Sequence, residues 1–241
     1  LDVGVVGDIK TVLGQLTDAL DGQVTPESYT TWRERLRGHN SSKTAQAEEV
    51  LSNPSKPIHP LRLCKEVRDF IDRDGVLCVD GQEILNFGRQ AMPTFSPGHR
   101  LNSGCLGTMG VGLPFGVGEK AAKPDKQVVV VHGDGSFGFN AMELDTAVRH
   151  GLPITVVISM KGGWTSDTKK EKPGRNIGYT PFDKMAEGLG CHAEFVEDPD
   201  DIRPALDRAR EANEIGKVAL VNVRTDENAG ATTTAFTQYR T

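Results

Sequence analysis

The sequence predicts an α/β fold, a doubly wound parallel sheet with helices on both of its faces. Short apolar runs of about five to seven residues alternate with amphipathic stretches of about ten or more, which is typical of crossover units between parallel strands. Four consecutive valines at 128–131 suit a strand that is buried on both faces. Polar, glycine-rich motifs at 80–82, 132–135 and 161–163 each follow an expected strand, and ligands of such open sheets bind where the strands end.

The first 59 residues differ from the rest. Residues 1–8 (LDVGVVGD) read as a strand and residues 9–20 as an amphipathic helix, so residues 1–21 form one strand–helix unit. A natural chain seldom begins on a core strand, and we therefore expect this chain to be the C-terminal part of a longer protein. Residues 22–59 are polar and predict a connector with one or two exposed helices, stopped by the segment NPSKP at 53–57.

From His59 onward the pattern is regular. Apolar spacing, valine runs and turn residues predict the elements of this region. Helices are expected at 61–73, 81–92, 140–150, 181–189 and 198–213, with a further helix inside the glycine-rich segment 104–118, and strands are expected at 76–80, 127–132, 154–160, 193–196 and 218–223.

The composition limits what the chain can be. Its 241 residues are 37% hydrophobic and 25% charged, with a net charge of −5, which fits a globular protein and speaks against nucleic acid as a partner. No apolar run approaches the ~18 residues of a membrane span, and the first residues of this sequence show no signal-peptide pattern. Cys64, Cys78, Cys105 and Cys191 show no metal-binding spacing, so we expect reduced thiols in a cytoplasmic protein.

The motif Gly133-Asp134-Gly135-Ser136 joins a strand to a helix. Its glycines let the backbone approach a ligand closely, and the N–H groups of the following helix suit a diphosphate. Ser136 can add a hydroxyl, and Asp134 is a hard oxygen ligand suited to Mg²⁺. The alternative is an ordinary tight turn in which Asp134 caps the helix.

The motif, with the helix and strand after it, resembles the signature of thiamine diphosphate-dependent enzymes. In that superfamily the aspartate binds Mg²⁺, a second ligand, usually Asn, lies 27 positions later, and a backbone carbonyl two residues beyond completes the set. The same count from Asp134 reaches Lys161 and Gly163. The resemblance thus implies thiamine diphosphate and Mg²⁺ as cofactors, with Asp134 and Gly163 as metal ligands and Lys161 at the usual asparagine position.

A second segment carries the same resemblance. GCLGTMGVGLPFG at 104–116 is similar to the family's GxLGTMGxGLPxxxG, which implies that the Gly107 carbonyl takes the cofactor's 4′-amino group and that Met109 forces its bent shape. Without the resemblance, this segment would read as glycine-rich helix packing with Met109 as core filler. Gly81 and Gln82 stand where relatives contact the diphosphate, although a plain helix start would look the same.

Details favour one branch of the superfamily. The segments GDGSFGFNAMELDTAVRHGLPITVVI, GGWT and KPGRNIGY resemble 2-hydroxyacyl-CoA lyases and oxalyl-CoA decarboxylases, whose C-terminal tail closes over a CoA thioester. Arg240 in the tail would then contact substrate, unless the tail is a frayed terminus. Trp164 would line the substrate pocket or serve packing. Acetolactate synthases share the GTMGxGLP segment.

The resemblance divides the chain into four parts and implies an activity. Residues 1–21 would end a central domain, 22–59 form a linker, 60–226 form the cofactor domain, and 227–241 a tail that is a possible active-site lid. The activity would be cleavage of a 2-hydroxyacyl-CoA into formyl-CoA and an aldehyde or ketone through a cofactor ylide. An acetolactate synthase-like enzyme or a 2-oxoacid decarboxylase is one alternative, and a non-catalytic subunit is another.

The catalytic glutamate of the family comes from an upstream domain, so no catalytic residue is expected within this chain. A homodimer, a homotetramer or a partner chain with the N-terminal domain would have to supply it.

Lys161 departs from the pattern. A charged lysine has three donors and no lone pair, so it cannot coordinate Mg²⁺. Three interpretations stay open at this point. The ammonium binds the diphosphate in place of the metal, or Lys161 turns outward and leaves the metal with Asp134, Gly163, phosphates and water, or cofactor binding is weakened or lost.

Overall fold

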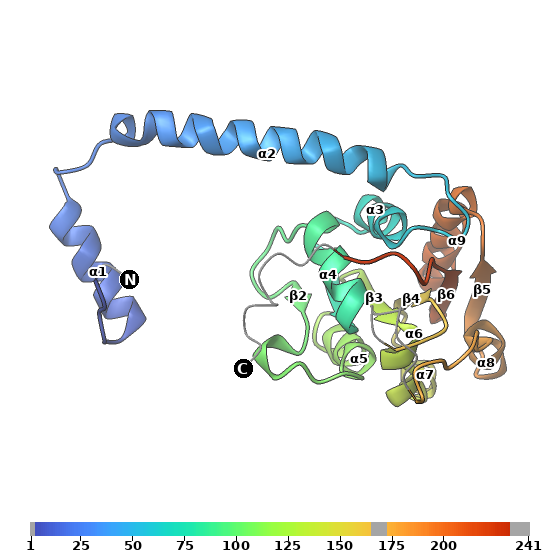
Figure 1. Ribbon diagram of the computed structural model, residues 1–241. Helices are drawn as coiled ribbons and strands as arrows, with labels where there is room; N and C mark the ends of the chain where they lie inside the picture. The colour runs from blue at the N-terminus through green and yellow to red at the C-terminus, as the bar shows by residue number, and fades with distance from the viewer. Residues whose placement is uncertain (1–2, 165–172, 232–241) are drawn as a thin grey trace. The chain divides into compact units, whose positions relative to one another are not determined.

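The computed structural model describes residues 3–164 and 173–231, and every structural statement below refers to these residues. The chain divides into two compact units, Leu1–Glu48 and Glu49–Thr241 (Figure 1). Each unit is described by itself.

The second unit contains the predicted parallel sheet. Its strand order is β2-β1-β3-β4-β6-β5, and every neighbouring pair is parallel. The strands are β1 (Val76–Asp80), β2 (Arg100–Leu101), β3 (Val128–Gly133), β4 (Thr155–Met160), β5 (His192–Val196) and β6 (Ala219–Arg224). The chain places β2 on one side of β1 and β3 on the other, so the direction of winding reverses between β1 and β3. This is a doubly wound sheet, as the alternation of strands and helices predicts.

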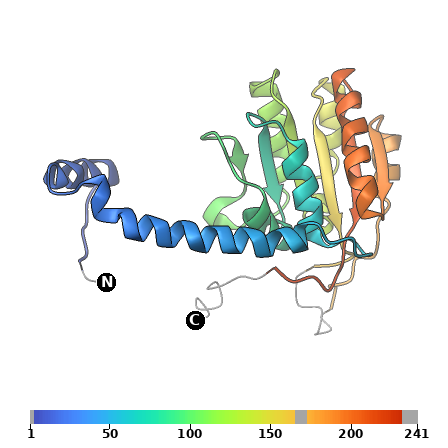
Figure 2. The same ribbon diagram turned by 90° about the horizontal axis from the view of Figure 1, so that it is seen from above.

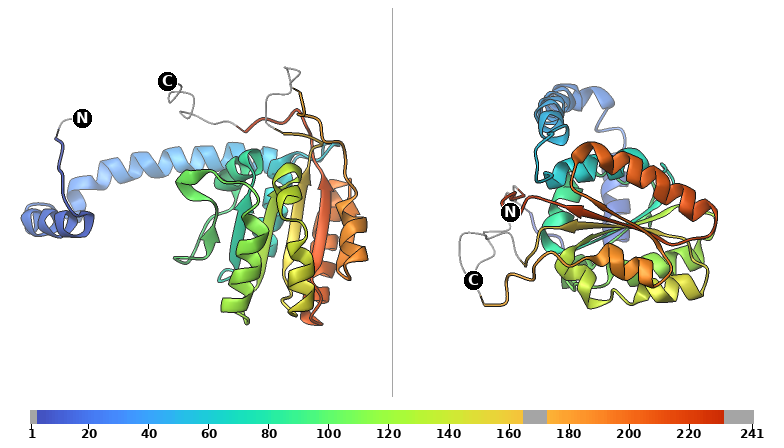
Figure 3. Two further views of the ribbon diagram at one scale, coloured as in Figure 1. Left: turned by 90° about the horizontal axis from the view of Figure 1, so that it is seen from below. Right: turned by 90° about the vertical axis from the view of Figure 1, so that its right-hand side faces the viewer.

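Helices cover both faces of the sheet, as the edge-on view in Figure 3 and the view in Figure 2 show. One face carries α3 (Pro60–Phe70), α4 (Gln82–Ala91) and α9 (Ile202–Glu214), and α3 packs against both others. The opposite face carries α5 (Gly112–Ala122), α7 (Glu143–Arg149) and α8 (Phe182–Gly188). Short elements complete the unit: α6 (Asp134–Phe139), η2 (Gly104–Leu106) and η3 (Pro199–Asp201).

The core follows from the valine run of β3. Val128 and Val130 belong to a buried cluster that includes Leu113 of α5 and Phe182 of α8, and side-chain alternation turns Val129 and Val131 to the other face. All four valines are at most 1% exposed. Complete burial of one such side chain stabilises the fold by about 1.5–3 kcal/mol, so this strand anchors both helical layers.

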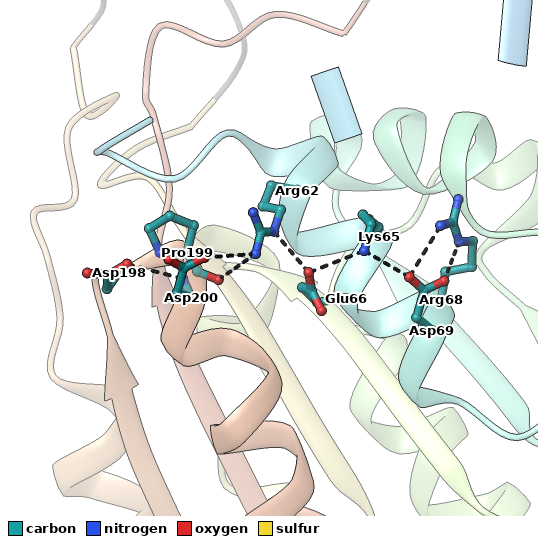
Figure 4. Close-up of polar contacts among 8 residues, drawn as sticks. All are labelled: Arg62, Lys65, Glu66, Arg68, Asp69, Asp198, Pro199 and Asp200. Atoms are coloured by element: carbon teal, nitrogen blue, oxygen red, sulfur yellow. Dashed lines mark hydrogen bonds and ion pairs between the residues drawn. The ribbon is translucent and has the colours of Figure 1, made fainter. Parts of the chain in front are cut away.

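A chain of ion pairs runs along α3 and ties its start to η3 (Figure 4). Arg62 Nε donates to Glu66 Oε1 at 2.9 Å, and its Nη2 donates to the Pro199 carbonyl and to Asp200 Oδ1, each at 3.3 Å. The Arg62 side chain is only 15% exposed. These bonds fasten the helix that precedes β1 to the element that precedes α9.

The first unit contains α1 (Ile9–Leu20), η1 (Pro26–Tyr29) and most of α2 (Thr30–Leu51). α1 begins as expected after Asp8, whose Oδ1 accepts the Thr11 N–H at 2.9 Å and caps the helix. The strand predicted at residues 1–8 is wrong for the described part, because residues 3–8 form no strand. Within the described residues they have no partner strand, and an isolated strand cannot satisfy its hydrogen bonds.

Other boundaries shift by a few residues. The predicted helix at 140–150 begins at Glu143 and is preceded by the separate helix α6, and β2, only two residues long, was not predicted. In the described ranges no helix is both long and apolar enough to cross a bilayer.

Candidate functional site

Two cavities adjoin at the carboxyl ends of β1, β3 and β4. The larger has a volume of about 480 Å³ and the smaller about 100 Å³. Residues 81–83 and Met109 line both. The ten residues predicted to hold a cofactor line one cavity or the other: Gly81, Gln82, Gly107, Met109, Gly133, Asp134, Gly135, Ser136, Lys161 and Gly163.

Gly81 brings the start of α4 against the loop after β3. Its φ of +119° is a conformation that side-chain-bearing residues rarely adopt. A Cβ at this position would lie 3.1 Å from the Gly133 nitrogen and 3.3 Å from Ser136 Oγ. The close approach of two loops at neighbouring strand ends therefore requires glycine, and it places Gln82 at the junction of the cavities.

Asp134 joins the loop after β3 to the loop after β4. The side chain is buried, with Oδ1 accepting the Gly135 N–H at 2.8 Å. Oδ2 accepts the N–H groups of Gly162 and Lys161 at 2.6 and 3.0 Å. Burial raises the pKa of Asp134, while these backbone bonds and the Lys161 charge act in the opposite direction. The carboxylate thus organises the backbone of the smaller cavity.

Ser136 borders the smaller cavity, but its hydroxyl bonds to atoms of the protein. Its Oγ donates toward the Asp80 and Gly133 carbonyls, each at 3.0 Å, and lies 3.2 Å from His132 Nδ1. The side chain is 2% exposed. In this arrangement the hydroxyl holds β1 and the β3 loop together, a role that the sequence interpretation of Ser136 as a diphosphate contact did not include.

The segment with Gly107 and Met109 forms a wall of the larger cavity. Gly107 follows η2 in the left-handed conformation, with φ +63°, and Met109 is 38% exposed. Asn140 Nδ2 donates to the Gly110 carbonyl at 2.8 Å, and the Gly112 N–H donates to Asp80 Oδ2 at 2.8 Å. These two anchors hold the wall in place.

Asp80, the first residue of the motif at 80–82, is a buried residue of the site to which the sequence interpretation gave no role. Burial raises its pKa, and N–H groups of Gly112, Gly110, Gly81 and Val111 act against that rise. Its position at the end of β1 was visible in the sequence, but the bond to a residue 32 positions later is a tertiary contact.

Lys161 forms an ion pair with Glu83 of α4. The two side chains are 12% and 9% exposed, so the lysine does not turn outward to solvent. Glu83 Oε1 is buried and has no hydrogen-bond partner among the described residues. The interpretation that turned Lys161 outward is therefore wrong for this structure. Sequence reasoning missed Glu83 as a site residue, because an acid in the first turn of a helix looks ordinary.

The described residues do not suit a divalent metal. The part of the chain that the structure describes contains no group of three or more His, Cys, Asp or Glu side chains that could hold one. Asp134 already accepts three backbone N–H groups, one at Oδ1 and two at Oδ2. Lys161 stands where the family has a neutral oxygen ligand. A divalent ion about 4 Å from an ammonium is repelled by about 8 kcal/mol at an effective dielectric constant near 20. A diphosphate fits better, since the loop 133–136 borders the smaller cavity and Lys161 supplies positive charge there.

Trp164 both lines the smaller cavity and packs on Gly135. A Cβ on Gly135 would lie 2.7–3.0 Å from three carbons of the indole ring. Phe139 also contacts the indole, with ring centroids 5.5 Å apart. Arg240, the other predicted substrate contact, lies outside the described residues.

The sequence is similar to those of known proteins. The family described as thiamine pyrophosphate enzyme, C-terminal TPP binding domain, matches residues 85–223. Two similar curated proteins are a 2-hydroxyacyl-CoA lyase 2 from Bos taurus and an acetolactate synthase large subunit from Mycobacterium tuberculosis. Each is 31% identical, over 94% and 92% of this chain, but over 37% and 41% of its own length. The chain thus spans about two fifths of those relatives.

A solved structure agrees as well. The thiamine diphosphate-dependent 4-hydroxybenzoylformate decarboxylase of Rhodococcus jostii RHA1 superposes with a TM-score of 0.66 at 25% identity, covering 72% of this chain and 34% of the decarboxylase. Fold, cavity and sequence lead to one conclusion: the chain belongs to the thiamine pyrophosphate (thiamine diphosphate) enzyme family and contains its C-terminal cofactor-binding domain.

Proposed function

We propose that the chain is the cofactor-binding part of a carbon–carbon lyase that cleaves a 2-hydroxyacyl-CoA into formyl-CoA and an aldehyde or ketone. One observation carries the proposal. Gly107, Met109 and the loop 133–136 converge on two adjoining cavities, in a chain 31% identical to a 2-hydroxyacyl-CoA lyase 2. Plant proteins named 2-hydroxyacyl-CoA lyase are similarly related, at 31% and 32%.

Each part of the site has a role in this proposal. Thiamine diphosphate, when bound, supplies the nucleophilic ylide and the electron sink. The loop 133–136 borders the smaller cavity, where the diphosphate would lie, and Met109 lines both cavities, where it would impose the bent shape. The Gly107 carbonyl would accept a hydrogen bond from the aminopyrimidine. Trp164 would border the substrate.

The proposal extends beyond the 241 residues. The glutamate that starts ylide formation would come from the upstream domain of a longer protein or of a partner chain, with the cofactor held between subunits of a homodimer or homotetramer. The free cysteines Cys64, Cys78, Cys105 and Cys191 are consistent with the cytoplasm.

An acetolactate synthase-like or 2-oxoacid decarboxylase activity is the nearest alternative, because relatives with the first name match equally well and the solved neighbour is a decarboxylase. A non-catalytic subunit is favoured by a different observation, the Lys161–Glu83 ion pair within the cofactor cavity.

The test is an activity assay on the protein together with the upstream region. The lyase proposal expects formyl-CoA from a 2-hydroxyacyl-CoA and slower consumption of pyruvate. Replacing Met109 by Ala should lower kcat at least about tenfold, whereas Met142→Ala, at a 62% exposed methionine outside both cavities, should not change it. Faster turnover of pyruvate would establish the 2-oxoacid alternative, and turnover of neither would favour the non-catalytic one.

A further inference from the structure

We infer that the Lys161 ammonium takes the place of a divalent cation in binding the diphosphate, and that Glu83 is the counter-ion that holds this ammonium until the diphosphate arrives. The inference rests on the proposed function, since it assigns how the same cofactor is held. It predicts a cofactor site whose affinity does not depend on magnesium.

The first step is the position of the lysine. Lys161 follows β4 directly, and its own N–H is bound to Asp134 Oδ2 at 3.0 Å. Lys161 lines the smaller cavity together with residues 133–136. Its backbone is therefore fixed at the loop where the diphosphate would lie, and its 12% exposed side chain crosses toward α4 instead of leaving the site.

The second step is the charge around the smaller cavity. Among the described residues that line it, Glu83 and Asp134 are acids and Lys161 is the cation. One positive and two negative charges sum to −1, which would repel an anionic ligand while the pair is intact. A diphosphate can be accepted only if Lys161 changes partner from Glu83 to phosphate oxygens, with which an ammonium forms charge-assisted bonds.

The Glu83 carboxylate can give up its bond to Lys161 when a phosphate replaces it. Its Oε2 pairs with Lys161, but its Oε1 is buried without a partner among the described residues, and an unsatisfied buried carboxylate oxygen is an unfavourable state. Glu83 also lines the larger cavity, of about 480 Å³. The carboxylate therefore has space into which it can turn when the diphosphate occupies Lys161.

Lys161 occupies the position at which the family usually has a metal ligand. The oxygen ligand usual in this position is replaced by a donor that has no lone pair, and of the about four lone-pair sites of the Asp134 carboxylate, three accept backbone N–H groups. A divalent cation would meet the ammonium as a like charge. Binding through Lys161 and binding through Mg²⁺ are thus mutually exclusive arrangements at this position.

The experiment is calorimetric titration of the chain, together with the upstream region, with inorganic pyrophosphate and with thiamine diphosphate, in Mg²⁺ and again in EDTA. The native chain should bind both ligands with the same Kd, within about twofold, in the two buffers. Lys161→Met should weaken binding at least about tenfold in both buffers, and Lys161→Arg should retain it. Glu83→Gln should bind pyrophosphate about tenfold more tightly, because the neutral amide no longer competes for the ammonium.

Two further variants sharpen the result. Lys161→Asn restores the neutral oxygen ligand, so its binding should appear only in Mg²⁺. Lys184→Met removes a lysine from a 67% exposed position on α8, which controls for the loss of one positive charge, and its Kd should equal that of the native chain. Thermal melts of each variant confirm that it is folded.

The outcomes separate the inference from the proposed function. Native binding that requires Mg²⁺, or weaker rather than tighter pyrophosphate binding by Glu83→Gln, would overturn the inference and leave the proposed function intact. If no chain binds either ligand, including Lys161→Asn with Mg²⁺, both the inference and the proposed cofactor site are wrong.

Discussion

Gly135 has no room for a side chain, because the ring of Trp164 lies where a Cβ would be. Gly138 in the same helix, α6, has nothing within 4 Å of that position. Gly135→Ala should displace the indole, lower the free energy of unfolding by about 1–3 kcal/mol and change the Trp164 fluorescence. Gly138→Ala should leave the fluorescence unchanged and raise stability by up to about 1 kcal/mol. Equal effects of the two variants in denaturant titrations would contradict the contact.

His132 is a residue whose protonation opposes folding. The imidazole is completely buried, and burial lowers its pKa from 6.5 to about 3. Between these values the unfolded chain binds a proton that the folded chain does not. The contribution of the neutral imidazole to the free energy of unfolding is therefore complete above about pH 6.5. Below that pH the contribution falls by about 1.4 kcal/mol per pH unit.

His132→Asn removes this proton from the balance. Urea titrations at pH 7.5, 6 and 5 should show the native chain losing stability more steeply than the variant below pH 6.5. Parallel losses in the two proteins would show that another group accounts for the pH dependence.

The helix α5 approaches β3 through Gly116. A Cβ there would lie 2.3 Å from Val130 Cγ2, whereas a Cβ on Gly118, half a turn later, would contact nothing within 4 Å. Gly116→Ala should therefore lower the free energy of unfolding by about 1–2 kcal/mol through overpacking. Gly118→Ala should raise it by up to about 1 kcal/mol through helix propensity. Thermal melts measure both, and a stabilised Gly116→Ala would mean that α5 and β3 are farther apart than described.

The ion-pair chain of α3 acts between elements rather than within one. Arg62 is 15% exposed and reaches both Glu66 and the η3 segment (Figure 4). Arg149 forms an i,i+4 pair with Asp145 on α7 but is 60% exposed. Arg62→Met should cost about 1–3 kcal/mol, while Arg149→Met should cost less than about 0.5 kcal/mol. Comparable losses in urea titrations would show that the Arg62 network stabilises the fold no more than an exposed ion pair does.

At the scale of the whole molecule, the sequence was sufficient for five of the six strands in the described residues and for ten of the residues that line the two cavities. These five strands and their parallel direction were predictable because buried parallel strands carry apolar runs, such as the valines at 128–131, that few other elements tolerate. The cavity residues were predictable because ligands bind where such strands end, and glycine motifs mark those ends.

The remainder depended on contacts between distant residues. The pairing of Lys161 with Glu83 joins positions 78 apart in the chain, and neither residue type signals it locally. β2 is two residues long and too short to show a period. The strand predicted at 1–8 failed for residues 3–8 because an alternating apolar pattern predicts a strand only where a partner is available. Gly135 and Ser136 read as a loop, yet they lie in α6.

The central claim, that the two adjoining cavities bind thiamine diphosphate, is tested most directly by thermal melts with thiamine diphosphate and with thiamine, which lacks the phosphates. A hundredfold excess over Kd stabilises the folded state by about 2.7 kcal/mol, which for a domain of this size raises Tm by roughly 5–10 °C. We expect that rise with thiamine diphosphate and a much smaller one with thiamine. An unchanged Tm with thiamine diphosphate, both with and without Mg²⁺, would contradict the account.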